Sequence, residues 1–159
     1  LARLQSSRPL LLCLLLPAAV LSLCVSWADF ARARVDKETA VELGAKMSGK
    51  PEKLYFQGHW GFQYYMERQG FQAFDIHKTN LKPGDILLVP TGNTNVDFPP
   101  PIFALVASKY ATPCSWLTLL DPRNGAGFYA DVFGSLPYAF GHVLGQDYLI
   151  YRFTGFPSP

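Results

Sequence analysis

The feature that most constrains this chain is an uncharged apolar run at residues 10–28, followed by about 130 residues with the composition of a folded domain. A helix of nineteen residues at 1.5 Å per residue is about 28 Å long, close to the hydrocarbon thickness of a bilayer. A charge-free run of this length is rarely a core helix of a soluble protein. The chain is therefore predicted to be membrane-anchored or secreted.

Two interpretations of the run compete. A cleaved signal peptide is favoured by the small residues Ser26 and Ala28, which stand where a signal peptidase would cut. A transmembrane helix is favoured by the length of the run and by the lack of an initiating Met before it. We expect residues 1–28 to form a transmembrane helix, the last membrane span of a longer protein.

The charge balance argues against nucleic acid as a partner, whereas the apolar run predicts that the partner is the lipid bilayer. The chain has 14 Lys and Arg against 12 Asp and Glu, and Arg3 and Arg8 precede the apolar run, so residues 29–159 are formally neutral. Nucleic-acid binding depends on a concentrated positive field. Arg3 and Arg8 favour a cytoplasmic N-terminus, although Arg32 and Arg34 reduce the asymmetry.

The cysteines and histidines predict neither a disulfide in the domain nor a metal site. Cys13 and Cys24 lie in the apolar run, and Cys114 stands alone in the domain, where a lone cysteine is more often a small buried hydrophobe. His77 and His142 have no neighbouring Cys or His at the spacing of metal ligands.

No cofactor is expected either. Gly125, Gly127 and Ala130 satisfy the relaxed dinucleotide pattern G-x-G-x-x-A. The helix that should follow is interrupted by Gly134 and Pro137, and the chain contains no P-loop. We therefore do not expect this segment to bind a nucleotide.

The local patterns of residues 29–159 predict a compact α/β domain with a mostly buried sheet. Helices are expected at residues 29–47 and 60–69, because Gly49 with Pro51, and Gly70, are typical helix terminators. Strands are expected at residues 53–57, 71–74, 86–89, 103–107, 116–120 and 148–153. The turn at Pro83-Gly84 precedes an unbroken apolar run typical of a buried strand. Residues 125–145 allow no assignment.

Four segments carry a family resemblance: GHWGFQYYME at residues 58–67, KPGDILLVP at 82–90, GAGFY at 125–129 and GSLPYAF at 134–140. With them the chain resembles the C-terminal extracytoplasmic domain of bacterial multi-spanning membrane proteins. These proteins are similar to the dolichyl-phosphate-mannose-protein mannosyltransferase and aminoarabinose transferase group. The likeness covers almost the whole chain.

The resemblance implies a glycosyltransferase that takes a sugar from a polyprenyl-phosphate donor to a glycan or lipid acceptor. It would work on the outer face of the inner membrane, with residues 29–159 on the extracytoplasmic side. In that group the catalytic carboxylate lies between early membrane helices, which this chain does not contain. We therefore expect no catalytic residue here, and a domain that assists acceptor recognition or covers the site. The alternative is a noncatalytic membrane-anchored interaction module.

His59 and Trp60 are the first candidates for substrate binding. They follow a predicted strand and open a predicted helix, where free backbone N–H groups and the positive end of the helix dipole can hold an anion. The competing interpretation is packing, because Trp60, Tyr64 and Tyr65 at helical spacing suit a core or a membrane-facing surface.

Arg123 is the third candidate for substrate binding. It follows a predicted buried strand, in a position where sheet-based folds commonly place binding loops. Its guanidinium suits an anionic substrate. The competing interpretation is a surface turn in which Arg123 pairs with Asp121.

Overall fold

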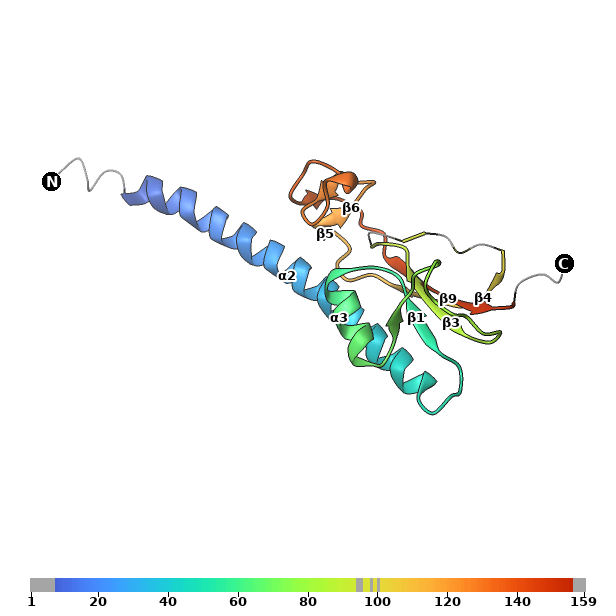
Figure 1. Cartoon of the computed structure of the whole chain (residues 1–159). Coiled ribbons are helices and arrows are strands. Elements are labelled where there is room, and N and C mark those ends of the chain that lie inside the picture. The colour runs from blue at the N-terminus through green and yellow to red at the C-terminus, as the bar shows by residue number, and fades with distance from the viewer. Residues whose placement is uncertain (1–7, 94–95, 98, 100, 156–159) are drawn as a thin grey trace. The chain divides into compact units, whose positions relative to one another are not determined.

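The computed structural model describes residues 8–93, 96–97, 99 and 101–155, and the chain divides into two compact units (Figure 1). The small unit comprises residues up to 31 together with residues 116–143. The sheet unit comprises residues 32–115 together with the chain from residue 144 onward. The first helix, α2 at Arg8–Met47, begins in the small unit and ends in the sheet unit.

The helix α2 joins the two helices predicted at residues 1–28 and 29–47 into one element of 40 residues. Within the described residues, it is the one helix long and apolar enough to cross a membrane. The side chains of residues 11–20 are all exposed, although most of them are leucine, valine or alanine. Pro17 lies inside the helix, where membrane helices tolerate proline.

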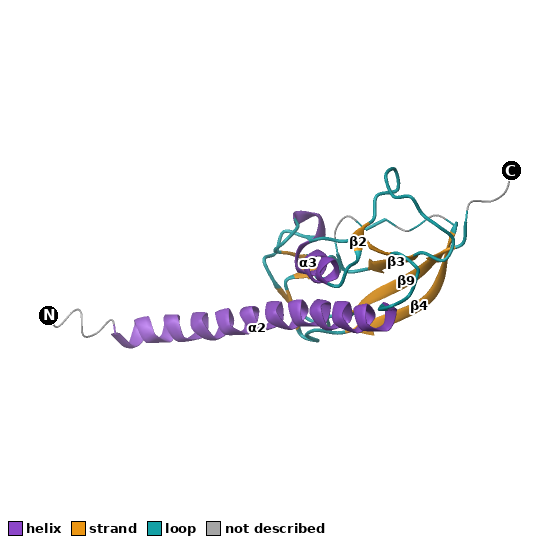
Figure 2. Cartoon of the chain, turned by 60° about the horizontal axis from the view of Figure 1, so that its bottom comes forward, coloured by secondary structure: helices purple, strands orange, loops and turns teal. Residues whose placement is uncertain are grey.

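The sheet unit is built on a mixed sheet of five strands in the order β2-β1-β3-β9-β4. Figure 2 labels β2, β3, β9 and β4 of this sheet. The strands are β1 at Leu54–Phe56, β2 at Gln72–Ala73, β3 at Ile86–Pro90, β4 at Phe103–Ala111 and β9 at Gln146–Phe153. β1 pairs in parallel with β2 and β3, whereas β9 is antiparallel to β3 and β4. The second helix, α3 at Trp60–Arg68, connects β1 to β2. The α/β class is therefore confirmed.

Side chains of successive strand residues point to opposite faces and form two apolar clusters. The last turns of α2 and the helix α3 cover one face, and this cluster contains Ala40, Leu43, Phe56, Phe62, Met66, Phe71, Leu88 and Tyr148. The cluster on the other face contains Tyr55, Leu87, Val89, Phe103 and Phe153. Helix α3 and strand β3 therefore lie where the sequence predicts them, because both have strongly apolar positions to bury.

The prediction of a mostly buried sheet holds for its centre but is wrong for both edge strands, β2 and β4. All five residues of β3 are buried, whereas β4 exposes most of its side chains. β4 also continues beyond the predicted residues 103–107 to Ala111, with an irregular register between Leu105 and Ala107. The difference arises because β4 pairs on one side only, with β9.

The segment KPGD forms the turn before β3. Gly84 has a φ of 100°, which favours glycine, and the Asp85 side chain is buried. Its carboxylate accepts hydrogen bonds from the backbone N–H of Lys53 at 3.0 Å and of Lys82 at 2.8 Å. This segment therefore stabilises the entry into β1 and β3.

In the small unit the prediction of one strand at residues 116–120 is wrong, because two short strands lie there instead. β5 at Leu117–Thr118 pairs with β8 at Ala139–Phe140, and β6 at Leu120–Asp121 pairs with β7 at Ala126–Gly127. A single 3₁₀ turn, η1, spans Asp131–Phe133. A Cβ on Gly127 would collide with the carbonyl oxygen of Gly134. The unassigned Gly-rich segment is thus a set of tight turns whose backbones touch.

Candidate functional site

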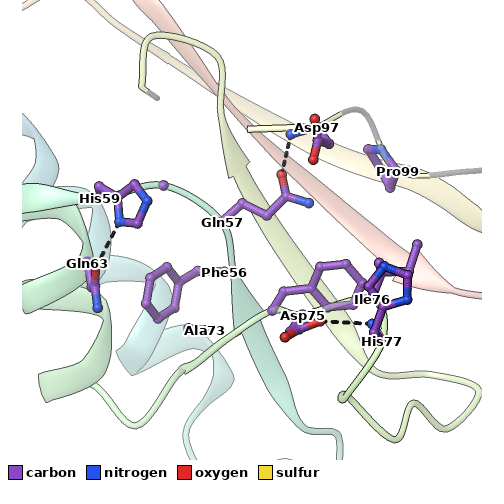
Figure 3. A pocket seen from close by; sticks show the side chains of 12 residues that line it. Phe56, Gln57, His59, Gln63, Ala73, Asp75, Ile76, His77, Asp97 and Pro99 are labelled. Carbon is purple, nitrogen blue, oxygen red and sulfur yellow. Dashed lines mark hydrogen bonds between the residues drawn. The ribbon is translucent and has the colours of Figure 1, made fainter. Parts of the chain in front are cut away.

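A cavity of about 470 Å³ lies in the sheet unit at the carboxyl ends of the parallel strands β1 and β2 (Figure 3). Crevices at this edge are the usual binding sites of sheets with parallel strands. The cavity is lined by Phe56, Gln57, Gly58, His59, Gln63, Ala73, Phe74, Asp75, Ile76, His77, Asp97 and Pro99. It combines an apolar floor with converging polar groups, which is typical of small-molecule sites.

The backbone of His59 is tied to the end of β3 through a buried side chain. Asn93 accepts a hydrogen bond from the His59 N–H at 2.9 Å and donates one to the His59 carbonyl at 3.3 Å. Gly58 precedes His59 with a φ of 101°, and a Cβ there would lie 3.1 Å from Pro90 Cγ. The chain therefore turns sharply from β1 into α3, and this turn places His59 on the cavity wall.

A row of hydrogen bonds along α3 orients the His59 ring. The Glu67 carboxylate accepts from Gln63 Nε2 at 2.8 Å, which directs Gln63 Oε1 toward His59 Nδ1 at 3.2 Å. An amide oxygen can only accept, so His59 Nδ1 carries the proton in this arrangement. The ring is thus held in one orientation, as a binding group requires.

The opposite wall carries two carboxylates. The Asp97 backbone N–H donates to Gln57 Oε1 at 2.7 Å, and the Asp75 carboxylate accepts from the His77 N–H at 2.9 Å (Figure 3). The hydrogen bond from the His77 backbone and the nearby Lys78 ammonium hold the pKa of Asp75 below its usual range. Neither the Asp97 carboxylate nor the His77 imidazole has a hydrogen-bond partner within the described part of the chain.

The chemistry of the lining favours a neutral, hydroxyl-rich ligand. Among the described lining residues there is no Lys or Arg, and the Asp97 carboxylate would repel a phosphate, whereas Lys78 at 3.3 Å offsets the charge of Asp75. Carboxylates, amides and imidazoles accept hydrogen bonds from hydroxyl groups, while Phe74 and Ile76 offer apolar surface to the C–H groups of a ring. A sugar has both kinds of surface.

The three residues predicted to bind substrate are separated by the structure. His59 lines the cavity, whereas Trp60 does not. Trp60 has a φ of 59°, which is unusual for a bulky residue and marks strain at the start of α3. Arg123 belongs to the small unit, so it is not part of this cavity.

Arg123 forms the turn pair that was the competing interpretation. Its Nε donates to Asp121 Oδ1 at 3.1 Å, and its backbone N–H donates to the same oxygen at 2.9 Å. Burial raises the pKa of Asp121, but these hydrogen bonds and the Arg123 charge outweigh it and hold the pKa below its usual range. Arg123 therefore compensates a buried carboxylate.

Sequence reasoning missed most of the cavity. Gln57, Asp75, His77 and Asp97 come from three separate loops, none of which has a motif. The available signal was positional, since residue 57 ends one predicted strand and residue 75 directly follows another. Parallel pairing of those strands, which the sequence does not reveal, brings the loops to one edge.

A second cavity of about 450 Å³ in the sheet unit has the opposite character. Basic side chains on its lining are Lys46, Lys50, Lys109 and Arg152. Glu42 pairs with Lys46 and Lys109, each at 2.6 Å, and these hydrogen bonds lower the pKa of Glu42 to about 2. Glu42 and Glu52 balance only two of these four basic side chains, so the groove keeps a net positive charge.

Comparison with protein-family models, with curated proteins and with solved structures finds no match. Within the described residues, no group of three or more His, Cys, Asp or Glu side chains is arranged to hold a metal ion. The function must therefore be argued from the helix α2 and the cavity themselves.

Proposed function

We propose that this chain is the C-terminal part of a membrane glycosyltransferase that uses a polyprenyl-phosphate sugar. Residues 10–28 of α2 cross the inner membrane, and the sheet unit lies on the extracytoplasmic side. The cavity beside His59 binds a sugar ring of the acceptor. The observation that carries the proposal is this hydroxyl-binding cavity in a domain that continues directly from a helix of membrane-spanning length.

The exposed leucines support the membrane anchor. Leu12, Leu16 and Leu23 each expose about two thirds or more of their surface, and no charged residue lies between positions 10 and 28. In water this apolar surface would cost about 25 cal/mol per Å². A bilayer removes that cost, since the run matches its hydrocarbon thickness.

The composition of the cavity supports a sugar and speaks against the anion first expected at His59 and Trp60. The carboxylate of Asp97, which is unpaired among the described residues, would repel a phosphate, whereas Asp75 and Asp97 can both accept hydrogen bonds from hydroxyl groups. The lipid-linked phosphate of the donor would then contact other parts of the enzyme. This division agrees with the family resemblance, in which the domain assists acceptor recognition.

The proposal is tested with the full chain in lipid nanodiscs. Saturation-transfer NMR with methyl hexosides and with a polyprenyl-phosphate hexose detects which ligand binds. Asp97→Asn should weaken hexoside binding about tenfold or more, because a hydrogen bond to a charged group contributes about 1.5–3 kcal/mol. Asp131→Asn, on an exposed residue of the small unit, is the matched control.

Saccharide binding that is equal in the parent chain and in Asp97→Asn would contradict the site. Sugar transfer by this chain alone would contradict the division of labour, because it would require catalytic groups that we assign to the rest of the enzyme.

A noncatalytic anchored module is the second candidate, and β4 is the observation that favours it. This edge strand exposes Leu105, Val106 and Tyr110, so it can pair with an added strand of a partner protein. The gene sequence upstream of residue 1 distinguishes the two candidates. About a dozen further apolar segments would support the enzyme, and a start codon near residue 1 would support the module.

A further inference from the structure

The small unit has an unusual distribution of apolar side chains between its interior and its surface. Its buried apolar residues include Leu117, Leu119, Leu120, Ala126, Ala139 and Val143. Its larger side chains point outward: Trp116, Phe128, Tyr129, Val132, Leu136 and Phe140 are all exposed, and Val132 exposes 78% of its surface. A soluble protein of this size rarely exposes so many large apolar side chains in one short segment.

The exposed rings form groups instead of standing singly. Trp116 stacks on Phe140 with ring centroids 5.9 Å apart and an angle of 11° between the planes. Tyr138 contacts Phe140 edge-on at 5.8 Å, and Phe128 contacts Tyr129 edge-on at 5.0 Å. These contacts hold the rings in fixed positions at the surface.

The same segment is nearly free of charge. Its ionised side chains are Asp121, Arg123 and Asp131, and the first two pair with each other. A surface that is apolar, aromatic and almost uncharged suits the boundary between lipid headgroups and acyl chains, where tyrosine and tryptophan are enriched.

A hydrogen bond places this segment at the end of the apolar run. The Tyr129 hydroxyl donates to Asp29 Oδ1 at 2.5 Å, and Asp29 is the first residue after residues 10–28. The exposed rings of Trp27 and Phe30 lie at the same level of the helix, with centroids 6.1 Å apart. The hydrogen bond thus places Tyr129 at the level of Trp27 and Phe30, where α2 would leave the bilayer.

We propose that residues 116–143 form a second membrane contact, with the outward side chains inserted at the lipid interface around the exit of α2. This inference rests on the proposed crossing of the membrane by α2. The occupant of the surface is lipid, because the segment is joined through Asp29 and Tyr129 to the end of a lipid-spanning run. The chain is then attached to the membrane at two places, through α2 and through this surface. The second attachment restricts how the small unit can move above the bilayer.

The three tryptophans of the chain allow a direct test. Full-length variants that keep only Trp27, only Trp60 or only Trp116, with Phe at the other two positions, are placed in nanodiscs. The lipids are phosphatidylcholines brominated near the headgroup end of the acyl chains, which quench a tryptophan on contact. Acrylamide in the aqueous phase instead quenches the tryptophans that face water.

We expect brominated lipid to reduce Trp116 emission at least twofold, as it does for Trp27, while acrylamide has little effect on either. Val132→Asp should restore most of the Trp116 emission and leave Trp27 quenched, and Val132→Leu should change neither. Trp60 lies in the sheet unit, and its unchanged emission spectrum in the single-Trp60 background shows that the Val132 variants remain folded.

Quenching of Trp116 by acrylamide but not by brominated lipid would overturn the inference, because the segment would then face water. Protection from both quenchers would also overturn it, since another protein would cover the surface. If Trp27 is not quenched by lipid, the proposed membrane crossing itself fails. A quenched Trp27 beside an unquenched Trp116 leaves the crossing intact and rejects only the second contact.

Discussion

At the scale of single residues, the most consequential group outside the cavity is the carboxylate of Asp36, buried between α2 and β9 in the sheet unit. It accepts hydrogen bonds from the Tyr148 hydroxyl at 2.5 Å and from Gln146 Nε2 at 3.0 Å. Arg32 donates to Gln146 Oε1 at 3.3 Å and to the Gly92 carbonyl. The groups that donate hydrogen bonds to the carboxylate are themselves hydrogen-bonded, so this cluster specifies how α2 packs on the sheet.

Burial raises the pKa of Asp36, although the hydrogen bond from Tyr148 and the charge of Arg32 act in the opposite direction. A raised pKa means that the folded state keeps the proton after the unfolded state has lost it. The stabilising contribution is complete below the unfolded value of about 3.9, and it is lost as the pH rises through the folded pKa.

Asp36→Asn should remove this pH dependence, because the amide oxygen still accepts hydrogen bonds but no longer titrates. Relative to the parent chain, the variant should gain stability as the pH rises from about 4 toward neutrality. Urea unfolding of both chains in detergent, followed by tryptophan emission at several pH values, provides the measurement. Parallel pH profiles of the two chains would contradict the raised pKa.

Gly58 and Gly61 form a matched pair for the turn that places His59. Gly58→Ala should destabilise the chain by about 1–3 kcal/mol, because an alanine would be strained at a φ of 101° and crowded by Pro90 and Asn93. Gly61→Ala should instead stabilise it by about 0.4–1 kcal/mol, since its Cβ would meet nothing within 4 Å.

Thermal unfolding of the two glycine variants decides the outcome. Similar melting temperatures for Gly58→Ala and Gly61→Ala would show that the turn can relax. The turn would then not be what positions His59 in the cavity.

At the scale of elements, the sheet divides into a buried centre and an exposed edge. Strand β3 has neighbours on both sides, and both of its faces are covered by apolar clusters. Strand β4 has one neighbour and is mostly exposed. A leucine in β3 should therefore contribute much more to the free energy of unfolding than a leucine in β4.

Leu88→Ala in β3 should lower the free energy of unfolding by about 2–5 kcal/mol, because it leaves a cavity in a packed core. Leu105→Ala in β4, where the leucine is 56% exposed, should cost less than about 0.5 kcal/mol. Leu88→Asp should unfold the sheet unit by burying an unpaired charge. Circular dichroism and urea unfolding test all three, and equal costs for the two alanine variants would contradict the assigned burial.

At the scale of the whole molecule, α2 is the element shared by both compact units. Its 40 residues extend over about 60 Å, roughly twice the hydrocarbon thickness of a bilayer. The part from Arg32 onward contributes Thr39, Ala40 and Leu43 to the interior of the sheet unit. Of the helix, only the part before Arg32 is therefore available to lie in lipid.

The chain should stay in the membrane pellet after alkaline carbonate extraction. Alkaline phosphatase fused after Pro159 should be active, and a fluorescent protein that folds only in the cytoplasm should be dark there. Leu15→Arg should weaken insertion, because a central arginine costs about 2.5–3.5 kcal/mol. Ala33→Arg, beyond the apolar run, is its control. The reverse reporter pattern would contradict the orientation, and a soluble form beginning at Asp29 would identify a signal peptide.

Local signals in the sequence determined several elements of this protein. The run at residues 10–28 indicates a lipid-length helix, and the unbroken apolar residues 86–89 predict the buried strand β3. Gly70, with a φ of 84°, ends α3 as expected. These predictions succeed because hydrophobic pattern and backbone preference act over a few neighbouring residues. His59 was likewise singled out from its local position between a strand and a helix.

Only the tertiary structure decided the contacts between residues far apart in sequence. Parallel pairing of β1 with both β2 and β3 brings Gln57, Asp75 and Asp97 to one cavity, although no motif connects them. The edge position of β4, the Asp29–Tyr129 contact and the touching backbones of Gly127 and Gly134 have the same origin. Strand order and loop approach depend on how the whole chain buries its apolar surface, which no short window of sequence encodes.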